Sequence, residues 1–297
     1  MNNDSTTNLL GHWLLAARPK TLLAGFAPVA IGASLAIRDG EFHLAAMLSA
    51  LLFAISVQIG TNFCNDYCDF FQGADTEDRK GPTRAVQAGL ISPRSMLMGT
   101  ILAFGIAALA AWMLYLRAGW PFLLLGVVSI AFGVLYTAGR FSLAYLGVAD
   151  PFVLVFFGPV AVCGTYFVQA LKMDGATVLA GLAPGLIATG LLVVNNLRDI
   201  DEDGAANKRT LAVRFGASFS RYQYAICIVA AALVPVVYAM LTGCRWALLG
   251  AIVLLPGALL IKLVATRSGT QLRPCLGMTA GLLLLYTVLF CTGLLIG

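Results

Sequence analysis

Long apolar runs follow one another along most of the chain, each about 20 residues long, the length that crosses a bilayer as a helix. The runs are continuous and do not alternate with a period of two, which favours helices over strands. Inside a bilayer the backbone polar groups must be satisfied within helices or closed barrels. The pattern predicts nine membrane helices, with expected ranges 20–37, 44–65, 95–116, 120–138, 143–170, 176–197, 222–242, 246–265 and 275–296.

Two prolines and the polar N-terminus modify this picture. Pro151 and Pro159 fall in the fifth run, so that helix is expected to be kinked or to begin late. Residues 1–12 are mostly polar and are expected to be flexible, without the pattern of a cleaved signal peptide. We therefore expect a single membrane domain over residues 1–297.

Composition supports the same class. Of the 297 residues, 60% are hydrophobic and only 11% are charged, with a mean hydropathy of +0.88. A soluble domain of this size does not need so much apolar surface, so we expect an all-α polytopic membrane protein. The net charge of +5 comes from bases spread over the loops between the apolar runs, so it predicts no nucleic-acid ligand. Nothing in the sequence predicts an obligate protein partner.

Basic residues fall unevenly on the two sides of the predicted bundle. If the N-terminus is cytoplasmic, 15 of the 19 Lys and Arg residues lie in cytoplasmic segments. The other four are Arg38, Arg117, Lys172 and Arg245. Because cytoplasmic loops carry the excess of positive charge, the N-terminus and the two long loops, 66–94 and 198–221, are expected to be cytoplasmic. The expected location is a bacterial inner membrane.

The two long loops concentrate the acidic residues. They hold 9 of the 14 acids, namely Asp66, Asp69, Asp75, Glu77 and Asp78 in the first and Asp199, Asp201, Glu202 and Asp203 in the second. Basic residues follow each cluster. Asn65 and Asn195 are 130 residues apart, as are Asp69 and Asp199. This echo predicts a weak internal repeat of four helices, with a ninth helix added at the C-terminus.

Polar stripes lead into both clusters. Gln58, Asn62, Asn65 and Asp69 are spaced to share one helix face, as are Thr189, Asn196, Asp199 and Asp203. Polar groups at membrane depth are costly unless they line a cavity or find partners. The two helices are therefore expected to face each other. That arrangement would bring Asn65, Asp66 and Asp69 opposite Asn196, Asp199 and Asp203.

So many carboxylates in one partly desolvated site need a cation or protons to neutralise them. Carboxylate and amide oxygens are hard ligands that suit Mg²⁺, which also keeps waters and binds phosphate. The candidate metal ligands are Asn65, Asp66, Asp69, Asp75, Asn196, Asp199 and Asp203. The candidate diphosphate-binding bases are Arg79, Lys80, Arg84, Lys208 and Arg209. A cation-coupled transporter is the alternative, although these acids lie at helix ends and not at mid-membrane.

These residues resemble a family. Asn65-Asp66-x-x-Asp69 and Asp199-x-Asp201-x-Asp203 are similar to the two aspartate-rich motifs of the UbiA superfamily of intramembrane aromatic prenyltransferases. Three further stretches resemble its branch that prenylates 1,4-dihydroxy-2-naphthoate, namely 18–22, 81–89 and 195–199. The stretch 208–214 fits that branch too. The broad pattern has a third aspartate where this chain has Gly73, and the acid comes at Asp75, an offset that the branch shares.

The resemblance implies Mg²⁺-dependent transfer of a polyprenyl group from its diphosphate to an aromatic acid. In the naphthoate branch, loss of CO₂ accompanies transfer and gives demethylmenaquinol for menaquinone biosynthesis. The catalytic candidates are Asp66, Asp69, Asp199 and Asp203, and the other substrate-binding candidates are Asn62, Tyr136, Arg140, Arg18, Lys20 and Asp150. For Arg18 and Lys20 the alternative is positive-inside anchoring, and for Asp150 a helix N-terminal acid. Acceptors of other members, 4-hydroxybenzoate or homogentisate, remain alternatives.

Overall fold

The computed structural model describes residues 3–72, 84–136 and 147–297, and within these ranges every element is helical. The elements follow the order α1 (Asn3–Ala17), α2 (Pro19–Arg38), α3 (Leu44–Gln72), α4 (Pro93–Ala118), α5 (Trp120–Leu135), α7 (Ala149–Val155), η1 (Phe156–Val160), α8 (Ala161–Ala170), α9 (Gly175–Arg198), α10 (Ile200–Ala205), α11 (Leu211–Thr242), η2 (Arg245–Val253), α12 (Leu254–Thr266), η3 (Gly269–Leu272) and α13 (Arg273–Ile296).

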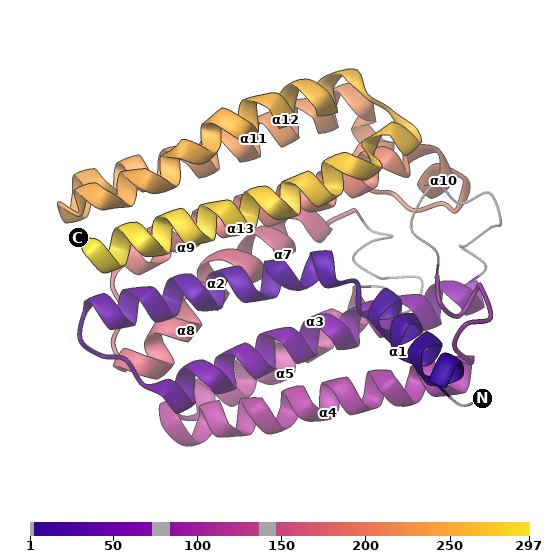
Figure 1. Ribbon diagram of the computed structural model, residues 1–297, viewed down its shortest axis with the longest axis horizontal. Helices are drawn as coiled ribbons and strands as arrows, with labels where there is room; N and C mark the ends of the chain where they lie inside the picture. The colour runs from indigo at the N-terminus through magenta and orange to yellow at the C-terminus, as the bar shows by residue number, and fades with distance from the viewer. Residues whose placement is uncertain (1–2, 73–83, 137–146) are drawn as a thin grey trace.

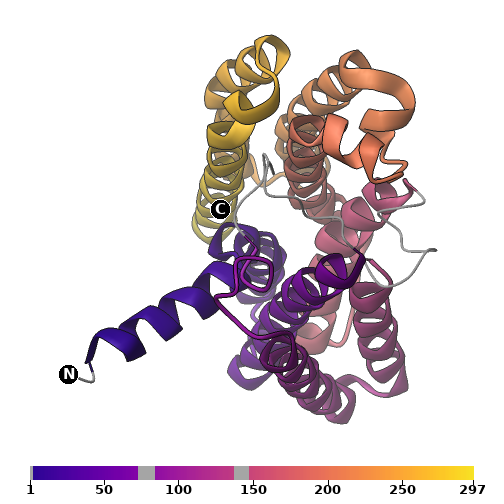
Figure 2. The same cartoon turned by 90° about the vertical axis from the view of Figure 1, so that its right-hand side faces the viewer.

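The long helices run side by side along the longest axis of the molecule, and α1 projects sideways from one end of the bundle (Figures 1 and 2). Eight helical segments in the described ranges are long and apolar enough to span a membrane, and α5 is a shorter apolar helix. Large apolar side chains face outward from them, such as Met240 and Leu255, which are 79% and 75% exposed. Lipid is the solvent that this surface fits, so the protein is an integral membrane protein and the all-α prediction is confirmed.

Two helices extend past their predicted ends. α3 continues to Gln72, not residue 65, because no glycine or proline interrupts it between Gly60 and Gly73. α11 begins at Leu211, not residue 222, where the hydroxyl of Thr210 accepts a hydrogen bond from the Val213 N–H at 3.3 Å. The short α10 fills much of the remaining segment. The predicted loops are therefore largely helical where the structure describes them.

The fifth predicted helix is interrupted, as its prolines indicated. Of the predicted range 143–170, the structure describes the residues from 147 on. The first helix there is α7, and a π-helical turn, η1, leads from it into α8. Gly158, just before Pro159, has non-helical angles of φ −117° and ψ −112°. A Cβ atom at Gly185 of α9 would lie only 2.3 Å from the carbonyl oxygen of Leu154. Small residues thus let α9 approach the kink closely, the usual device of packing in membranes.

α9 runs through the centre of the largest apolar core, which it shares with α2, α8, α11 and α13. Its residues are buried over most of its length, down to Leu197 and Arg198. A central helix surrounded on all sides has little freedom to shift. Its C-terminal end therefore presents Asn195, Asn196 and Asp199 in fixed positions.

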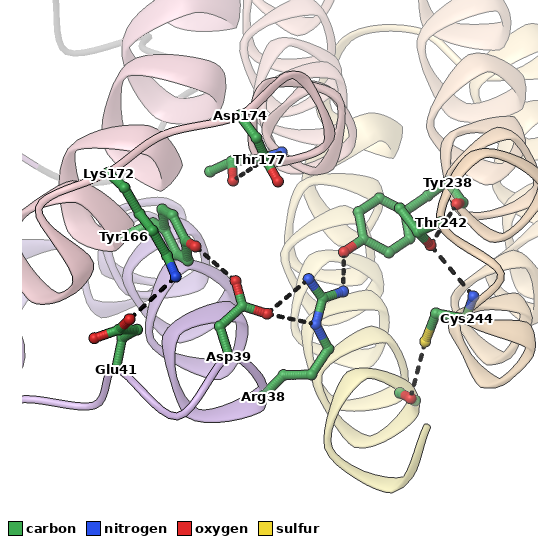
Figure 3. A network of polar contacts seen from close by, with 11 residues as sticks. Arg38, Asp39, Glu41, Tyr166, Lys172, Asp174, Thr177, Tyr238, Thr242 and Cys244 are labelled. Atoms are coloured by element: carbon green, nitrogen blue, oxygen red, sulfur yellow. Dashed lines mark hydrogen bonds and ion pairs between the residues drawn. The ribbon is translucent and has the colours of Figure 1, made fainter.

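A polar network ties the helices at the end away from α10 (Figure 3). Arg38 donates to the Tyr238 hydroxyl and, from Nε, to Asp39 Oδ1 at 3.0 Å. The Tyr166 hydroxyl donates to Asp39 Oδ2 at 2.6 Å. These bonds join α2, α8 and α11 where each ends or begins. The network stabilises the bundle far from the two acidic clusters.

Candidate active site

A cavity of about 370 Å³ brings the two polar stripes together. It opens among α2, α3, α5, η1 and α9 and is polar toward the α10 end. Of the six residues expected to face each other, the structure places five in its wall, namely Asn65, Asp69, Asn196, Asp199 and Asp203. Asn62 and Gln58 continue the α3 stripe along the same wall. Residues 65 and 195, and 69 and 199, which the predicted repeat relates, all line it.

Asp69 is the most enclosed of these carboxylates, with 0% of its surface exposed. Arg84 Nη2 donates to its Oδ2 at 2.5 Å, and Lys208 Nζ lies 3.8 Å from its Oδ1. One base follows the first acidic cluster and the other follows the second. The two halves of the chain thus converge on one carboxylate, and the positive charges offset the cost of burying it.

Asp199 has a similar partner. Arg198 donates from Nε to Oδ1 and from Nη2 to Oδ2, both at 2.6 Å, and from Nη2 to Asn195 Oδ1 at 2.8 Å. All three residues line the cavity. Neither Arg198 nor Asn195 was among the site residues predicted from the sequence. The signals were present, since Arg198 directly precedes a motif aspartate and Asn195 is the counterpart of Asn65 in the repeat.

Asp66 lies apart from this group. Its carboxylate accepts hydrogen bonds from the backbone N–H groups of Ala85 at 3.0 Å and Val86 at 3.4 Å. It is 2% exposed and is not part of the cavity wall. The expectation that Asp66 faces the second cluster with Asn65 is therefore corrected. Adjacent helix residues point about 100° apart, so the two side chains cannot share one stripe.

Several predicted substrate-binding residues do line the cavity. Arg18 stands in a left-handed conformation, φ 51°, between α1 and α2, and Lys20 enters α2 two residues later. Tyr136, which caps α5, lines the same polar end. Asn62 Nδ2 donates to the carbonyl oxygen of Ala17 at 2.9 Å and to Thr21 Oγ1 at 3.0 Å. Asn62 thus also fixes the junction that positions Arg18.

Other predicted residues lie elsewhere. Asp150 accepts a hydrogen bond from Gln223 Nε2 at 2.7 Å and lines a much smaller neighbouring cavity of about 10 Å³, with Tyr136 and Asn196. Arg209 is exposed and is absent from the walls of both cavities. The remaining predicted site residues, Asp75, Arg79, Lys80 and Arg140, lie outside the described residues.

The oxygens in the wall fit a hard cation. Among the described residues, Asn65 Oδ1 and Asp69 Oδ1 are buried and have no hydrogen-bond partner. No three acidic, histidine or cysteine side chains of the described ranges lie close enough together to hold an ion by themselves. That sparse set suits Mg²⁺, which uses one or two carboxylates and takes its other ligands from water and phosphate.

The deeper part of the cavity is apolar and partly aromatic. Phe132 of α5 lies 4.7 Å from Phe152 and 5.1 Å from Phe156, measured between ring centroids. All three rings line the cavity, as do Phe53 and Phe122 farther from the acidic end. A molecule with an anionic head and a long hydrocarbon tail would match this change from polar to apolar walls.

Comparisons with known proteins agree over nearly the whole chain. A sequence profile of the UbiA prenyltransferase family matches residues 26–282. The chain is 36% identical over 300 residues to the 1,4-dihydroxy-2-naphthoate octaprenyltransferase of Haemophilus influenzae, with 97% of each chain covered. It is 38% identical over 289 residues to the protein of the same name from Mycobacterium tuberculosis, with 96% of each covered.

Solved structures share the fold. A UbiA homolog from Aeropyrum pernix K1 matches with a TM-score of 0.70 at 15% identity, over 92% of this chain and 97% of that one. A UbiA homolog from Archaeoglobus fulgidus, bound to DMAPP and Mg²⁺, matches with a TM-score of 0.59 at 14% identity, over 94% of this chain and 98% of that one.

Proposed function

The chain belongs to the UbiA prenyltransferase family, and from this premise we propose that it transfers a polyprenyl group from its diphosphate to 1,4-dihydroxy-2-naphthoate. Transfer with loss of CO₂ yields demethylmenaquinol, a step of menaquinone biosynthesis. One observation carries the proposal: a single cavity joins buried carboxylates and bases at one end to apolar, aromatic walls at the other. The naphthoate acceptor is supported by relatives that match over almost their full length.

We assign Mg²⁺ to the polar end, held by the amide and carboxylate oxygens of the wall. The proposed ligands, direct or through water, are Asn65, Asp69, Asn196, Asp199 and Asp203, with Asp75 of the undescribed segment as a further candidate. When bound, the ion neutralises negative charge that develops on the departing diphosphate. The UbiA homolog bound to Mg²⁺ supports this cofactor.

The bases around the carboxylates suit the diphosphate. Arg84 and Lys208 already face Asp69, and Arg198 faces Asp199, so each can take a phosphate oxygen without leaving the site. Arginine binds phosphate oxygens in pairs, which orients the leaving group. Arg79 and Lys80 remain candidates for the same role. Arg209, exposed outside the cavity, is not included.

The apolar walls suit the prenyl chain and the reactive carbon. Ionisation of an allylic diphosphate leaves a cation that water would quench, and apolar walls disfavour water beside it. The faces of Phe132, Phe152 and Phe156 can stabilise such a cation. We infer that Arg18 and Lys20, which line the cavity, bind the acceptor's carboxylate. Tyr136 lines this cavity and Asp150 lines the adjoining small one, which supports both as contacts of the acceptor's ring substituents. Arg140, which lies outside the described residues, is proposed for the same role.

The distribution of bases supports a location in a bacterial inner membrane. The acidic end of the bundle then faces the cytoplasm, where both substrates' polar groups arrive. The network of Arg38, Asp39 and Tyr166 lies where α2 ends, at the side of the bundle opposite to α10 (Figure 1).

Metal removal tests the proposal. Purified protein treated with EDTA should not transfer a polyprenyl group to the naphthoate, and added Mg²⁺ should restore transfer. Asp69→Ala should stay inactive after Mg²⁺ is added, while Glu41→Gln, at an exposed ion pair with Lys172, should behave as the wild type. Full activity of Asp69→Ala would contradict the assigned metal site.

A further inference from the structure

The carboxylate of Asp66, a motif aspartate, is turned to the backbone of a neighbouring segment. Its Oδ2 accepts from the N–H of Ala85 at 3.0 Å and its Oδ1 from the N–H of Val86 at 3.4 Å. Both carboxylate oxygens of Asp66 therefore accept hydrogen bonds from backbone N–H groups, which can move only if the backbone moves with them. The side chain is 2% exposed and is not part of the cavity wall.

The segment that Asp66 holds, residues 84–91, is a compact turn. The N–H of Ala88 donates to the carbonyl oxygen of Arg84 at 3.0 Å, and the N–H of Leu90 to that of Ala85 at 2.9 Å. Gly89 has a positive φ of 68°, which a glycine adopts without strain. Ala85 and Val86 are 0% and 3% exposed.

α1 packs over this turn. Ala85, Val86, Ala16 and Ala17 belong to one small apolar cluster, which Trp13 also contacts. Trp13 lies 5.2 Å from Phe63 of α3, centroid to centroid. The turn is therefore fixed from one side by α1 and from the other by Asp66. Trp13 is a natural reporter of whether the turn stays in place.

Arg84 begins the turn, directly before the two amides that Asp66 binds. Its Nη2 donates to Asp69 Oδ2 at 2.5 Å, and its side chain is only 5% exposed. Asp66 and Asp69 are three residues apart on α3, so they lie about one helical turn from each other. One carboxylate holds the backbone of the turn and the next receives its guanidinium.

We propose that Asp66 is a positioning residue that anchors the 84–91 turn and so sets Arg84 against Asp69, and that it is not a magnesium ligand. The inference rests on the proposed function, since Arg84 matters there as a diphosphate ligand. To bind a metal, Asp66 would have to release two buried amides, which would lose their hydrogen bonds. Asp69 Oδ1 and Asn65 Oδ1 are buried without hydrogen-bond partners in the described chain, so each can turn to a metal without releasing a hydrogen bond.

The first test uses Asp66→Asn and Asp69→Asn side by side. An asparagine at 66 keeps one acceptor and loses the other, so the turn loosens. Asp66→Asn should raise the KM for polyprenyl diphosphate by about tenfold, the effect of weakening one charged contact. Its half-saturating Mg²⁺ concentration should stay within about twofold of the wild type, whereas Asp69→Asn should shift it by about tenfold or more. A Mg²⁺ shift in Asp66→Asn equal to that of Asp69→Asn overturns the proposal.

The second test does not depend on turnover. Replacing Trp112, Trp120 and Trp246 by Phe leaves Trp13 as the single tryptophan. In this background, adding Asp66→Asn should increase the quenching of Trp13 fluorescence by acrylamide, whereas adding Arg84→Gln should not. If acrylamide quenches Trp13 equally with and without Asp66→Asn, the proposal that Asp66 anchors the turn is overturned. This result holds even if the protein proves inactive on the naphthoate.

The same background with Asp66 intact covers the case in which Asp66→Asn does not fold. Trp13 should stay as shielded when Mn²⁺ and inorganic diphosphate are added as in their absence, because the anchor holds in both states. Binding of Mn²⁺ is followed separately by its paramagnetic resonance signal. Exposure of Trp13 when Mn²⁺ binds would mean that Asp66 leaves the amides for the metal, and would overturn the proposal.

Discussion

Asp69 and Asp199 lie 130 residues apart and face the same cavity, and each is held by an arginine. Arg84 Nη2 donates a hydrogen bond to Asp69 at 2.5 Å, and Arg198 donates two hydrogen bonds of 2.6 Å to Asp199. The site therefore carries its own counter-charges. When Mg²⁺ and a diphosphate enter, the cation can take the carboxylates and the phosphate oxygens can take the arginines, so no buried charge is left unpaired.

Arg198→Lys should separate charge from geometry. Lysine keeps the positive charge but cannot make the two parallel bonds to Asp199 or reach Asn195 at the same time. We expect kcat/KM for polyprenyl diphosphate to fall by about 10- to 100-fold, equivalent to about 1.4–2.7 kcal/mol. Steady-state kinetics over a range of donor concentrations measures it. Arg117→Lys, at the far end on the carbonyl oxygens of Val168 and Gln169, is the matched control and should leave kcat/KM unchanged.

Phe132→Leu should slow the chemical step more than it weakens binding. The substitution keeps an apolar side chain but removes a ring face from the cavity. Cation–π stabilisation at a desolvated site is worth about 1–2 kcal/mol, so kcat should fall about 5- to 30-fold with little change in KM. Single-turnover kinetics tests this split. Phe215→Leu, at an exposed ring outside the cavity, is the comparison, and equal losses in both variants would argue against the assigned role.

Gly185→Ala tests the close crossing of α9 with the kinked fifth helix. The added Cβ would stand 2.3 Å from a backbone oxygen, so α9 must shift. We expect loss of about 1–3 kcal/mol, seen as a lower midpoint of thermal unfolding in detergent. Gly105→Ala in α4 meets no atom within 4 Å. The free energy of unfolding of that variant should be unchanged or higher by up to about 1 kcal/mol. An equal loss of stability in both variants would contradict close packing at the crossing.

Tyr166→Phe tests whether the far-end network serves stability alone. It removes the hydroxyl that donates to Asp39 at 2.6 Å while keeping the buried ring. The free energy of unfolding should fall by about 1–2 kcal/mol. Prenyl transfer below the unfolding temperature should remain that of the wild type. Tyr222→Phe, at a side chain that is 73% exposed, should change neither quantity.

The membrane bundle could be predicted because hydropathy is a property of long segments. The ends of the helices could not be predicted in this way. An apolar run stops at the edge of the bilayer, whereas a helix can continue beyond it. α3 continues into its acidic end, and α11 begins at a threonine cap that sequence analysis left in a loop. α1 was expected to be without structure over much of its length, yet the described chain has a helix from Asn3, whose C-terminal half packs on the 84–91 turn.

The candidate site was predictable in its acids and not in its pairings. Helical spacing placed Asn65 and Asp69 on one face, and the structure puts both in the cavity wall. The same spacing puts Asp66 on a different face of the helix. The motif alone does not distinguish Asp66 from Asp69. The partners of Asp69 come from 15 and 139 residues away, so only the folded chain reveals them. Arg198 was interpreted only as one of the cytoplasmic bases that set membrane orientation, so it was not predicted as a site residue.

The most direct measurement offers purified protein a mixture of acceptors. Octaprenyl diphosphate, Mg²⁺ and equal amounts of 1,4-dihydroxy-2-naphthoate, 4-hydroxybenzoate and homogentisate are incubated with the protein in lipid vesicles. The products are then identified by mass spectrometry. We expect one main product, the naphthoate with an added octaprenyl group and without its carboxylate, formed only when Mg²⁺ is present. Prenylated 4-hydroxybenzoate or homogentisate as the main product, or a naphthoate product formed without divalent metal, would contradict it.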